Sequence, residues 1–269
     1  MRRETIVKEL IRRGYRAEKY EAVKNGVICK GIVIRGENGI SPVIYTDALI
    51  REEEREGNSV AHIANRIAGI YEDSKNIKFD KELLLDEDFI LQQIRVGIQK
   101  KSTQNLEKFP CKFPEMEMYL YFFWEVGMHC SAKLTPEYLS RVGISSSDAW
   151  LTAFQNTFRE TRVISMTSLG EKFWRESYDP QMYILTNVRK EYGASAIMNL
   201  HALKKLDEEV GNGSHKFFVL PSSIHEMILI PYDEKYELDD LSEMVRLVNA
   251  TEVEEEEQLS DKAYILDVI

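Results

Sequence analysis

The chain of 269 residues has few cysteines, a deficit of positive charge and no long apolar run. Its three cysteines, Cys29, Cys111 and Cys130, are an odd number at irregular spacing, which excludes a disulfide framework. Lys and Arg total 35 and Asp and Glu total 45, so the formal net charge of −10 argues against a uniformly cationic nucleic-acid binder. The longest apolar run, residues 118–124, is far too short to cross a bilayer.

The first residues also lack the apolar core of a secretory signal peptide, because a charge interrupts them every three or four positions. Together with the cysteine usage, this predicts a reducing, cytoplasmic location. Apolar residues make up 43% of the chain, enough to bury a core, which excludes an intrinsically disordered protein.

The common catalytic and metal-binding signatures are missing as well. The sequence has no dinucleotide-binding glycine fingerprint, no phosphate-binding loop, no G-x-S-x-G nucleophile elbow, no H-E-x-x-H and no C-x-x-C. Catalytic groups converge in space, so these absences disfavour an enzyme without excluding one. We expect no cofactor and no bound metal.

The apolar periodicity predicts helices and strands in alternation along the whole chain. Helices are expected at residues 6–11, from Thr46 or Asp47, from Ser59, at 86–98, from Pro136 with Thr135 as N-cap, from a cap at 145–148 to about 158, and at 201–210 and 238–248. Strands are expected at 27–35, 41–45, 115–126, 182–187, 194–199, 217–221, 226–231 and 263–266. Turn signals such as Asn25-Gly26 join several strands into hairpins. These patterns predict an α+β fold of mixed, mainly antiparallel sheets with packed helices.

The Pro- and Ser-containing stretch at residues 100–114 is the best candidate for an internal boundary. We expect an N-terminal α+β region, residues 1–108, and a C-terminal α+β region, residues 109–269.

One turn collects side chains that could do chemistry. Ser222, Ser223, His225 and Glu226 follow one another between two predicted strands. An imidazole can activate a hydroxyl, which suggests a hydrolase. Residues so close together in a hairpin rarely reach the geometry of a nucleophile and its base, however, and serine side chains also stabilise turns through the backbone.

Two further groups could belong to a site. Thr186 and Asn187 end a predicted strand just before Gly193, which could mark a binding site or an ordinary turn. His129 and Cys130 are adjacent, but neighbouring strand residues point to opposite faces, so we interpret Cys130 as a small core residue.

Charge is concentrated at the two ends of the chain. Eleven acidic residues lie between Asp233 and Glu257 against two basic ones, and the stretch ends in Glu254, Glu255, Glu256 and Glu257. Such a surface could bind a basic partner, or it could simply be solvated. The predicted first helix has a basic outer face that could contact nucleic acid or could also be merely solvated. Its cations are Arg2, Arg3, Lys8, Arg12 and Arg13.

Three ordered motifs resemble an uncharacterised bacterial family of unknown function. They comprise Met182, Tyr183, Leu185, Thr186 and Asn187, followed by a Gly-Ala pair; then Leu220 to Ser223, His225 and Glu226; then Asn249, Thr251, Leu259, Ser260, Asp261 and Tyr264. Residues 25–36 and 40–47 are similar to the same family, so the resemblance covers nearly the whole chain. Residues 158–166 depart from its pattern.

The resemblance implies a soluble bacterial protein, often from genomes rich in mobile elements, and brings no activity, cofactor or catalytic residue with it. Our leading hypothesis is a non-catalytic module that binds another protein, for example a mobile-element accessory that modulates a host system. The alternatives are a hydrolase that uses His225 and a nucleic-acid binder that uses the basic helix. No membrane partner is expected.

Overall fold

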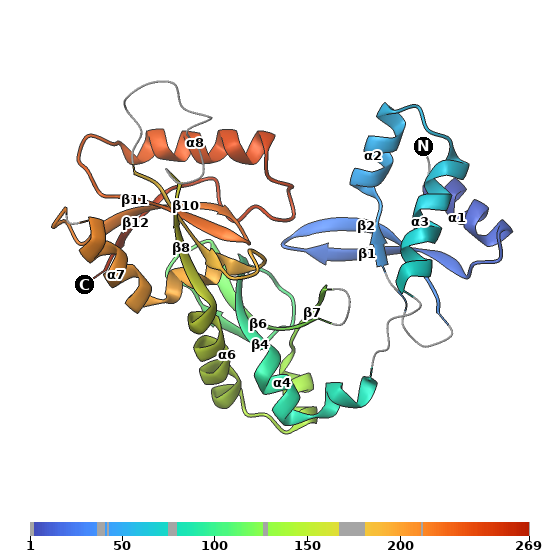
Figure 1. Cartoon of the computed structure of the whole chain (residues 1–269), viewed down its shortest axis with the longest axis horizontal. Coiled ribbons are helices and arrows are strands. Elements are labelled where there is room, and N and C mark those ends of the chain that lie inside the picture. Colours follow the sequence, from blue (N-terminus) through green and yellow to red (C-terminus); the bar gives the residue numbers. More distant parts are fainter. Residues whose placement is uncertain are drawn as a thin grey trace. The chain divides into compact units, whose positions relative to one another are not determined.

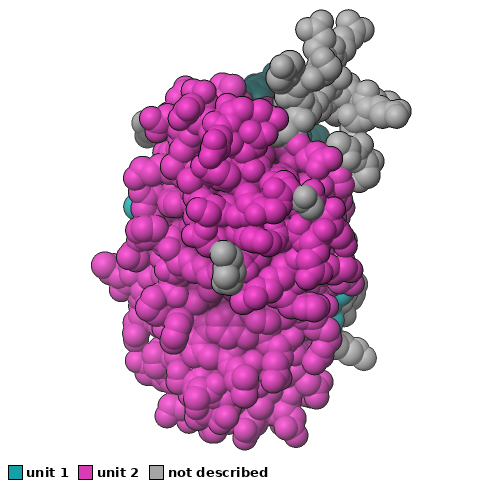
Figure 2. Space-filling model, turned by 90° about the vertical axis from the view of Figure 1, so that its left-hand side faces the viewer, with its two compact units in different colours: residues 1–81, 125–130 teal, residues 82–124, 131–269 magenta. Residues whose placement is uncertain are grey.

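The computed structural model shows an α+β fold with three sheets and packed helices (Figure 1). It describes residues 3–36, 41, 43–74, 80–125, 129–166, 181–210 and 212–268. Contacts along the chain divide it into two compact units (Figure 2). The first holds residues 1–81 and 125–130, and the second holds residues 82–124 and 131–269.

The first unit packs three helices against one face of a three-stranded sheet. Its elements are α1 (Arg3–Arg12), β1 (Ala17–Lys24), β2 (Val27–Ile34), β3 (Val43–Tyr45), α2 (Asp47–Arg55) and α3 (Val60–Ser74). The strands pair antiparallel in sequence order, and Asn25 and Gly26 make the first turn with φ of 48° and 86°. This confirms the predicted turn, because a two-residue hairpin loop of this kind needs positive φ at both positions. Ile6, Ile32 and Ile63 meet in the core and are fully buried.

The second unit begins with a small sheet built around one long strand. Its first elements are η1 (Lys81–Leu85), α4 (Glu87–Gln93), β4 (Ile94–Lys100), β5 (Lys108–Pro110), β6 (Met116–Glu125), β7 (His129–Lys133), α5 (Pro136–Val142) and α6 (Ser146–Glu160). β6 pairs with β4, β5 and β7. Thr135 and Ser145 cap α5 and α6 by accepting hydrogen bonds from Tyr138 N–H and Asp148 N–H, as their sequence pattern predicts.

A larger antiparallel sheet completes the second unit. Its strands lie in the order β12-β10-β11-β9-β8. The elements are β8 (Thr161–Ser165), β9 (Tyr183–Asn187), η3 (Gly193–Met198), α7 (Leu200–Val210), β10 (Lys216–Ser223), β11 (Glu226–Pro231), α8 (Leu238–Thr251) and β12 (Tyr264–Asp267). Helix α8 lies over one face, where Leu241 and Val245 pack on Phe218 (Figure 1).

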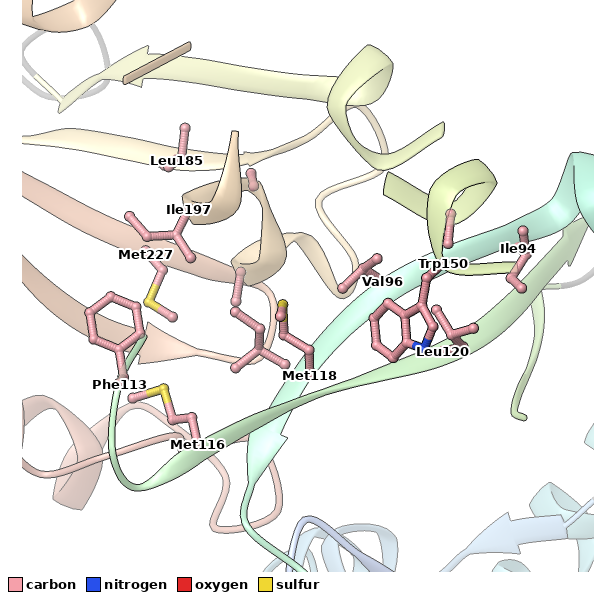
Figure 3. Packing of buried hydrophobic residues seen from close by; sticks show 14 of the residues in the cluster. Ile94, Val96, Phe113, Met116, Met118, Leu120, Trp150, Leu185, Ile197 and Met227 are labelled. Carbon is pink, nitrogen blue, oxygen red and sulfur yellow. The ribbon is translucent and has the colours of Figure 1, made fainter. Parts of the chain in front are cut away.

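The main core lies between the two sheets of the second unit. Met116, Met118 and Leu120 alternate along one face of β6 and meet residues of both sheets, among them Val96 and Met227 (Figure 3). This period-2 pattern follows from strand geometry, because alternate side chains point to the same face. The core therefore fixes how β9, β10 and β11 lie against β6.

Two predicted elements are wrong. Residues 94–98 form a strand rather than the end of a helix, because the apolar residues Ile94, Val96 and Ile98 alternate and pair with β6. Residues 193–198 form a buried 3-10 turn rather than a strand, and their small side chains fill the space next to β9 and β11. Most of the other predicted elements, including α6, α8 and the β10–β11 hairpin, are confirmed.

The predicted boundary near residue 108 falls inside the small sheet. β4 precedes that residue, β6 follows it, and the two strands pair over seven residues from Ile94 to Lys100. The contacts instead divide the chain after Lys81. The division into an N-terminal region 1–108 and a C-terminal region 109–269 stays a prediction.

Candidate functional site

The motif segments of the C-terminal half meet at the turn between β10 and β11, which we call the His225 turn (residues 223–226). The hydroxyl of Thr186 donates to the carbonyl oxygen of His225 at 2.8 Å. Ala194 N–H donates to Ile224 O at 3.2 Å, and Ile224 N–H donates to Glu257 O at 2.8 Å. Segments that lie far apart in the sequence are thus joined at one turn.

Gly193 is required for this convergence. A Cβ atom at residue 193 would lie 2.4 Å from Thr186 Oγ1, 2.6 Å from His225 O and 2.7 Å from Asn187 N. Real Cβ atoms essentially never come so close to other atoms, and two of these three belong to backbone. Gly193 therefore allows β9 and the His225 turn to touch, rather than marking a place for a ligand.

Both ring nitrogens of His225 have partners. Tyr192 N–H donates to Nδ1 at 3.1 Å, and Nε2 lies 3.3 Å from Glu257 Oε1. Because Nδ1 accepts a hydrogen bond, the proton of the neutral ring is assigned to Nε2, where it faces the carboxylate. The ring then has no free lone pair with which to take a proton from a nucleophile.

The two serines do not supply a nucleophile to that ring. Ser223 Oγ accepts the backbone N–H of His225 at 3.1 Å, which is the turn-stabilising role. Ser222 is half-buried, and no hydrogen bond joins its hydroxyl to His225 among the described residues. Burial raises the pKa of the half-buried Glu226 despite the opposing charges of His225 and Lys190. Within the described residues, no serine–histidine pair of the kind a hydrolase needs is formed.

Asn187 holds the loop that presents Tyr192. Its side-chain amide donates to Glu191 O at 2.7 Å, and its Oδ1 accepts Arg189 N–H at 3.0 Å. The loop needs this support because Lys190 and Tyr192 have φ of 58° and 54°, which costs side-chain-bearing residues free energy. Asn187 and Thr186 are both buried and hydrogen-bonded within the fold.

A charged cluster that sequence reasoning missed ties the same loop to α6. Glu160 accepts from Arg95 at 2.7 Å and from Arg189 at 2.5 Å. Burial raises the pKa of Glu160, but the hydrogen bonds and charges of the two arginines outweigh it, and the net pKa is lowered. No local signal could have revealed this cluster, because its members come from three separate segments.

The third motif, which runs from Asn249 to Tyr264, also has a structural role. The side chain of Asn249 donates to Ser260 O at 2.9 Å and to Asp261 Oδ1 at 2.8 Å. Ser260 Oγ lies 2.9 Å from Glu115 Oε2 and 2.8 Å from the Tyr264 hydroxyl. These bonds fasten the segment after α8 to the rest of the unit.

The basic helix α1 has its charges neutralised within the first unit. Lys8 pairs with Glu4 at 2.9 Å, while Arg12 and Arg13 both bond to Glu9. Those two hydrogen bonds lower the pKa of Glu9 to about 2. Arg3 pairs with Asp47, and Arg2 lies outside the described residues. This arrangement does not favour the nucleic-acid alternative, which needs unpaired cations for phosphates.

The acidic C-terminal stretch differs from α1 in that many of its charges are not paired within the described chain. A set of exposed carboxylates on α8 and beside it, which we call the acidic surface, has no cation partner within the described part of the chain. It consists of Glu234, Glu237, Asp239, Asp240, Glu252 and Glu255. Of the four consecutive glutamates, Glu254 and Glu255 are exposed, Glu256 is half-buried, and Glu257 faces His225.

The thiols and potential metal ligands offer no built site in the residues described. Cys29 is buried, and Cys111 and Cys130 are half-buried free thiols whose pKa is raised by burial. The interpretation of Cys130 as a core residue is therefore wrong, because β7 leaves that residue partly exposed. Among the described residues no group of three or more His, Cys, Asp or Glu could hold a metal ion. None of the helices searched in that same part of the chain is long and apolar enough to span a membrane.

Comparisons with known proteins agree with the resemblance seen in the sequence. No curated protein and no solved structure matches the chain. The model of a family of unknown function, DUF5688, matches residues 3–267. The chain therefore belongs to the family DUF5688, to which no function has been assigned.

Proposed function

We propose that the chain is a non-catalytic binding module that recognises a basic segment of another protein through the acidic surface. The carrying observation is that these six carboxylates are exposed and have no cation partner among the described residues. An unpaired charge on a surface is available to a partner of opposite charge, whereas a paired one must first be released.

Apolar side chains on the same helix indicate a protein rather than a simple counter-ion. Met244 and Leu247 are 38% and 64% exposed on α8. They follow Asp240 at spacings of four and seven residues, which places all three on one face of the helix. An amphipathic segment with basic and apolar residues would match this face.

The proposal includes a bacterial, cytoplasmic setting and a role for a mobile element that modulates a host protein. It has support in the motif resemblance and in the free thiols, which are typical of reducing compartments. The hydrolase alternative finds no support in the ring contacts of His225.

The test is affinity capture from a native lysate with the full chain and with the variant Asp239→Asn/Asp240→Asn. We expect proteins held by the wild type to elute from the variant at clearly lower salt, because the variant lacks two exposed charges that have no cation partner in the described chain. The matched control is Glu87→Gln/Asp88→Asn, which removes two exposed charges from the first turn of α4. Equal salt resistance in both variants, or nothing retained by the wild type after a salt wash, would contradict the proposal.

A further inference from the structure

The outer edge of β8 is not covered by another strand of the described chain. β8 is the last strand of the larger sheet and pairs only with β9 among the residues described. Val188 N–H donates to Glu160 O, and Met166 N–H donates to Met182 O, at the two ends of this pairing. Alternate residues of an antiparallel strand face the partner strand, so 160, 162, 164 and 166 bond to β9. Thr161 and Val163 therefore turn their backbone groups away from β9, and the N–H of Thr161 donates to Phe158 O.

Val163 is the centre of this edge. In the register with β9, its N–H and C=O point away from that strand, no other described strand pairs with β8, and the residue is 37% exposed. A free edge of this kind can accept another extended chain, and natural proteins usually cover or distort such edges. The outward-facing donor and acceptor of Val163 thus indicate a position where a strand can be added.

A groove lies directly beside this edge, between β8 and α7. Its volume is about 520 Å³, and its walls include Val163 and Ser165 from the strand and Ala202 and Leu206 from the helix. Leu206 is buried and supplies an apolar floor. A strand that binds the edge would place alternate side chains in this groove.

The groove favours negative charge. Arg162, His201 and Lys205 line it, and Glu209 is the one acidic residue among the described groups that do so. Glu209 lies 3.9 Å from Lys205 Nζ, which is longer than a hydrogen bond, and both side chains are exposed. Asn199 fixes the start of α7 beside the start of β8, because its amide donates to Thr161 Oγ1 at 3.1 Å and to Phe158 O at 3.2 Å. The positive end of the α7 dipole thus lies at the same end as Thr161.

We propose that the groove between β8 and α7 binds an extended acidic segment of a partner protein by adding it as a strand beside β8. The backbone of Val163 would supply one donor and one acceptor, and Arg162 and Lys205 would meet the acidic side chains. The occupant is extended because the backbone groups of Val163 belong to a strand edge, and it is acidic because Arg162 and Lys205 outnumber Glu209 in the lining. This inference goes beyond the proposed function, since it concerns a different surface with the opposite charge preference.

The test starts from a random library of twelve-residue peptides displayed on phage and selected on the immobilised full chain. Enriched peptides are synthesised with a fluorescent label, and their dissociation constants are measured by fluorescence polarisation. We expect enrichment in Asp and Glu together with β-branched residues. Hydrogen exchange with and without the peptide is expected to show new protection of the Val163 amide.

Three variants locate the binding. Val163→Pro removes the outward N–H, and Pro is tolerated on the outer side of an edge strand. Lys205→Glu reverses an exposed charge in the groove, so its fold should be kept even if the proline variant is unstable. Val163→Pro and Lys205→Glu are each expected to weaken peptide binding about tenfold or more. The matched control Lys204→Glu changes an exposed neighbour that does not line the groove, and should change the affinity less than about twofold.

Several outcomes would overturn the inference. These are a library that yields no peptides or only basic ones, and peptides that bind Lys205→Glu as tightly as the wild type. Self-association of the chain that both variants abolish would show that a second copy, and not another protein, occupies the edge.

Discussion

The His225 turn and the acidic surface are both dense in polar side chains, but they use them in opposite ways. Around the turn, Tyr192 N–H and the Thr186 hydroxyl donate hydrogen bonds to His225, and the Glu257 carboxylate faces its Nε2, so the polar atoms of His225 have their partners within the fold. On the acidic surface, the carboxylates of Asp239 and Asp240 have no partner in the described chain and are left to solvent.

This difference teaches where function is to be sought. A polar group that already has its partners contributes to stability, and recruiting it for binding would first require breaking those bonds. Helix α1 follows the same rule, because its described cations are paired with acidic residues of the first unit. The number of polar and charged residues does not distinguish the acidic surface from the His225 turn and α1. Whether those residues already have partners within the fold does distinguish them.

The largest effect is expected from Gly193→Ala, at the residue that packs against the His225 turn. The added Cβ would overlap His225 O and Asn187 N, so strands must separate, and we expect a loss of at least about 3 kcal/mol in the free energy of unfolding. The reduced entropy of the unfolded chain offsets less than about 1 kcal/mol of this. Urea unfolding of the wild type and the variant measures this loss in the free energy of unfolding.

Gly69→Ala is the matched control, because it lies in α3 and a Cβ atom added there would have no other atom within 4 Å. There alanine should stabilise the chain by up to about 1 kcal/mol, as expected for a helix interior. If Gly193→Ala were as stable as this control, the close contact at the His225 turn would not exist.

The next effect is expected from Glu160→Gln, which leaves Arg95 and Arg189 without their shared carboxylate. We expect a loss of about 2 kcal/mol, at the lower end for breaking a buried ion pair because the site is partly exposed. Urea unfolding at neutral pH measures it, with the exposed Glu208→Gln as control.

The loss of stability in Glu160→Gln should also depend on pH. The pKa of Glu160 is lower in the folded chain than its ordinary value of 4.5, so its stabilisation is complete above that value. It is lost as the pH falls below 4.5 through the lowered folded pKa. The difference between wild type and Glu160→Gln should therefore shrink in acid, and a difference that grows there would contradict the assignment.

A smaller effect is expected from His225→Ala. The variant loses the hydrogen bond from Tyr192 N–H, but the half-exposed site lets water replace it, so about 1 kcal/mol is expected. Thermal unfolding compares it with His201→Ala, whose exposed ring has no hydrogen bond in the described chain. Equal stability of the two variants would mean that His225 has no structural role.

Much of the fold could be predicted from the sequence because the signals are local. Thr135 and Ser145 start helices through their own side chains, and Asn25-Gly26 makes its turn through its own backbone preferences. The prediction failed at residues 94–98 and 193–198, where pairing with β6 and packing of small residues decide the conformation. Those contacts are made by residues distant in sequence.

The site was predictable only in part, for the same reason. The sequence offered His225, Thr186 and Asn187 as candidates; Thr186 donates to His225 O, and Asn187 holds the loop that leads to Tyr192. It could not show that Tyr192 N–H and Glu257 occupy the two ring nitrogens of His225, because those groups lie 33 and 32 positions away. The Glu160 cluster and the groove beside β8 left no sequence pattern at all.

The smallest effect on stability is expected where the proposed binding is strongest, at Asp239 and Asp240. Changing both to Asn removes two favourable charges from the first turn of α8, worth a few tenths of a kcal/mol each, and also relieves repulsion within a chain of net charge −10. The two effects oppose each other, so urea unfolding should show a change below about 0.5 kcal/mol that diminishes as salt is added. Gly193→Ala should show no such salt dependence, because its cost is steric. A large, salt-independent loss in the Asp239→Asn/Asp240→Asn variant would place these carboxylates among the structural groups and remove the contrast between the two regions.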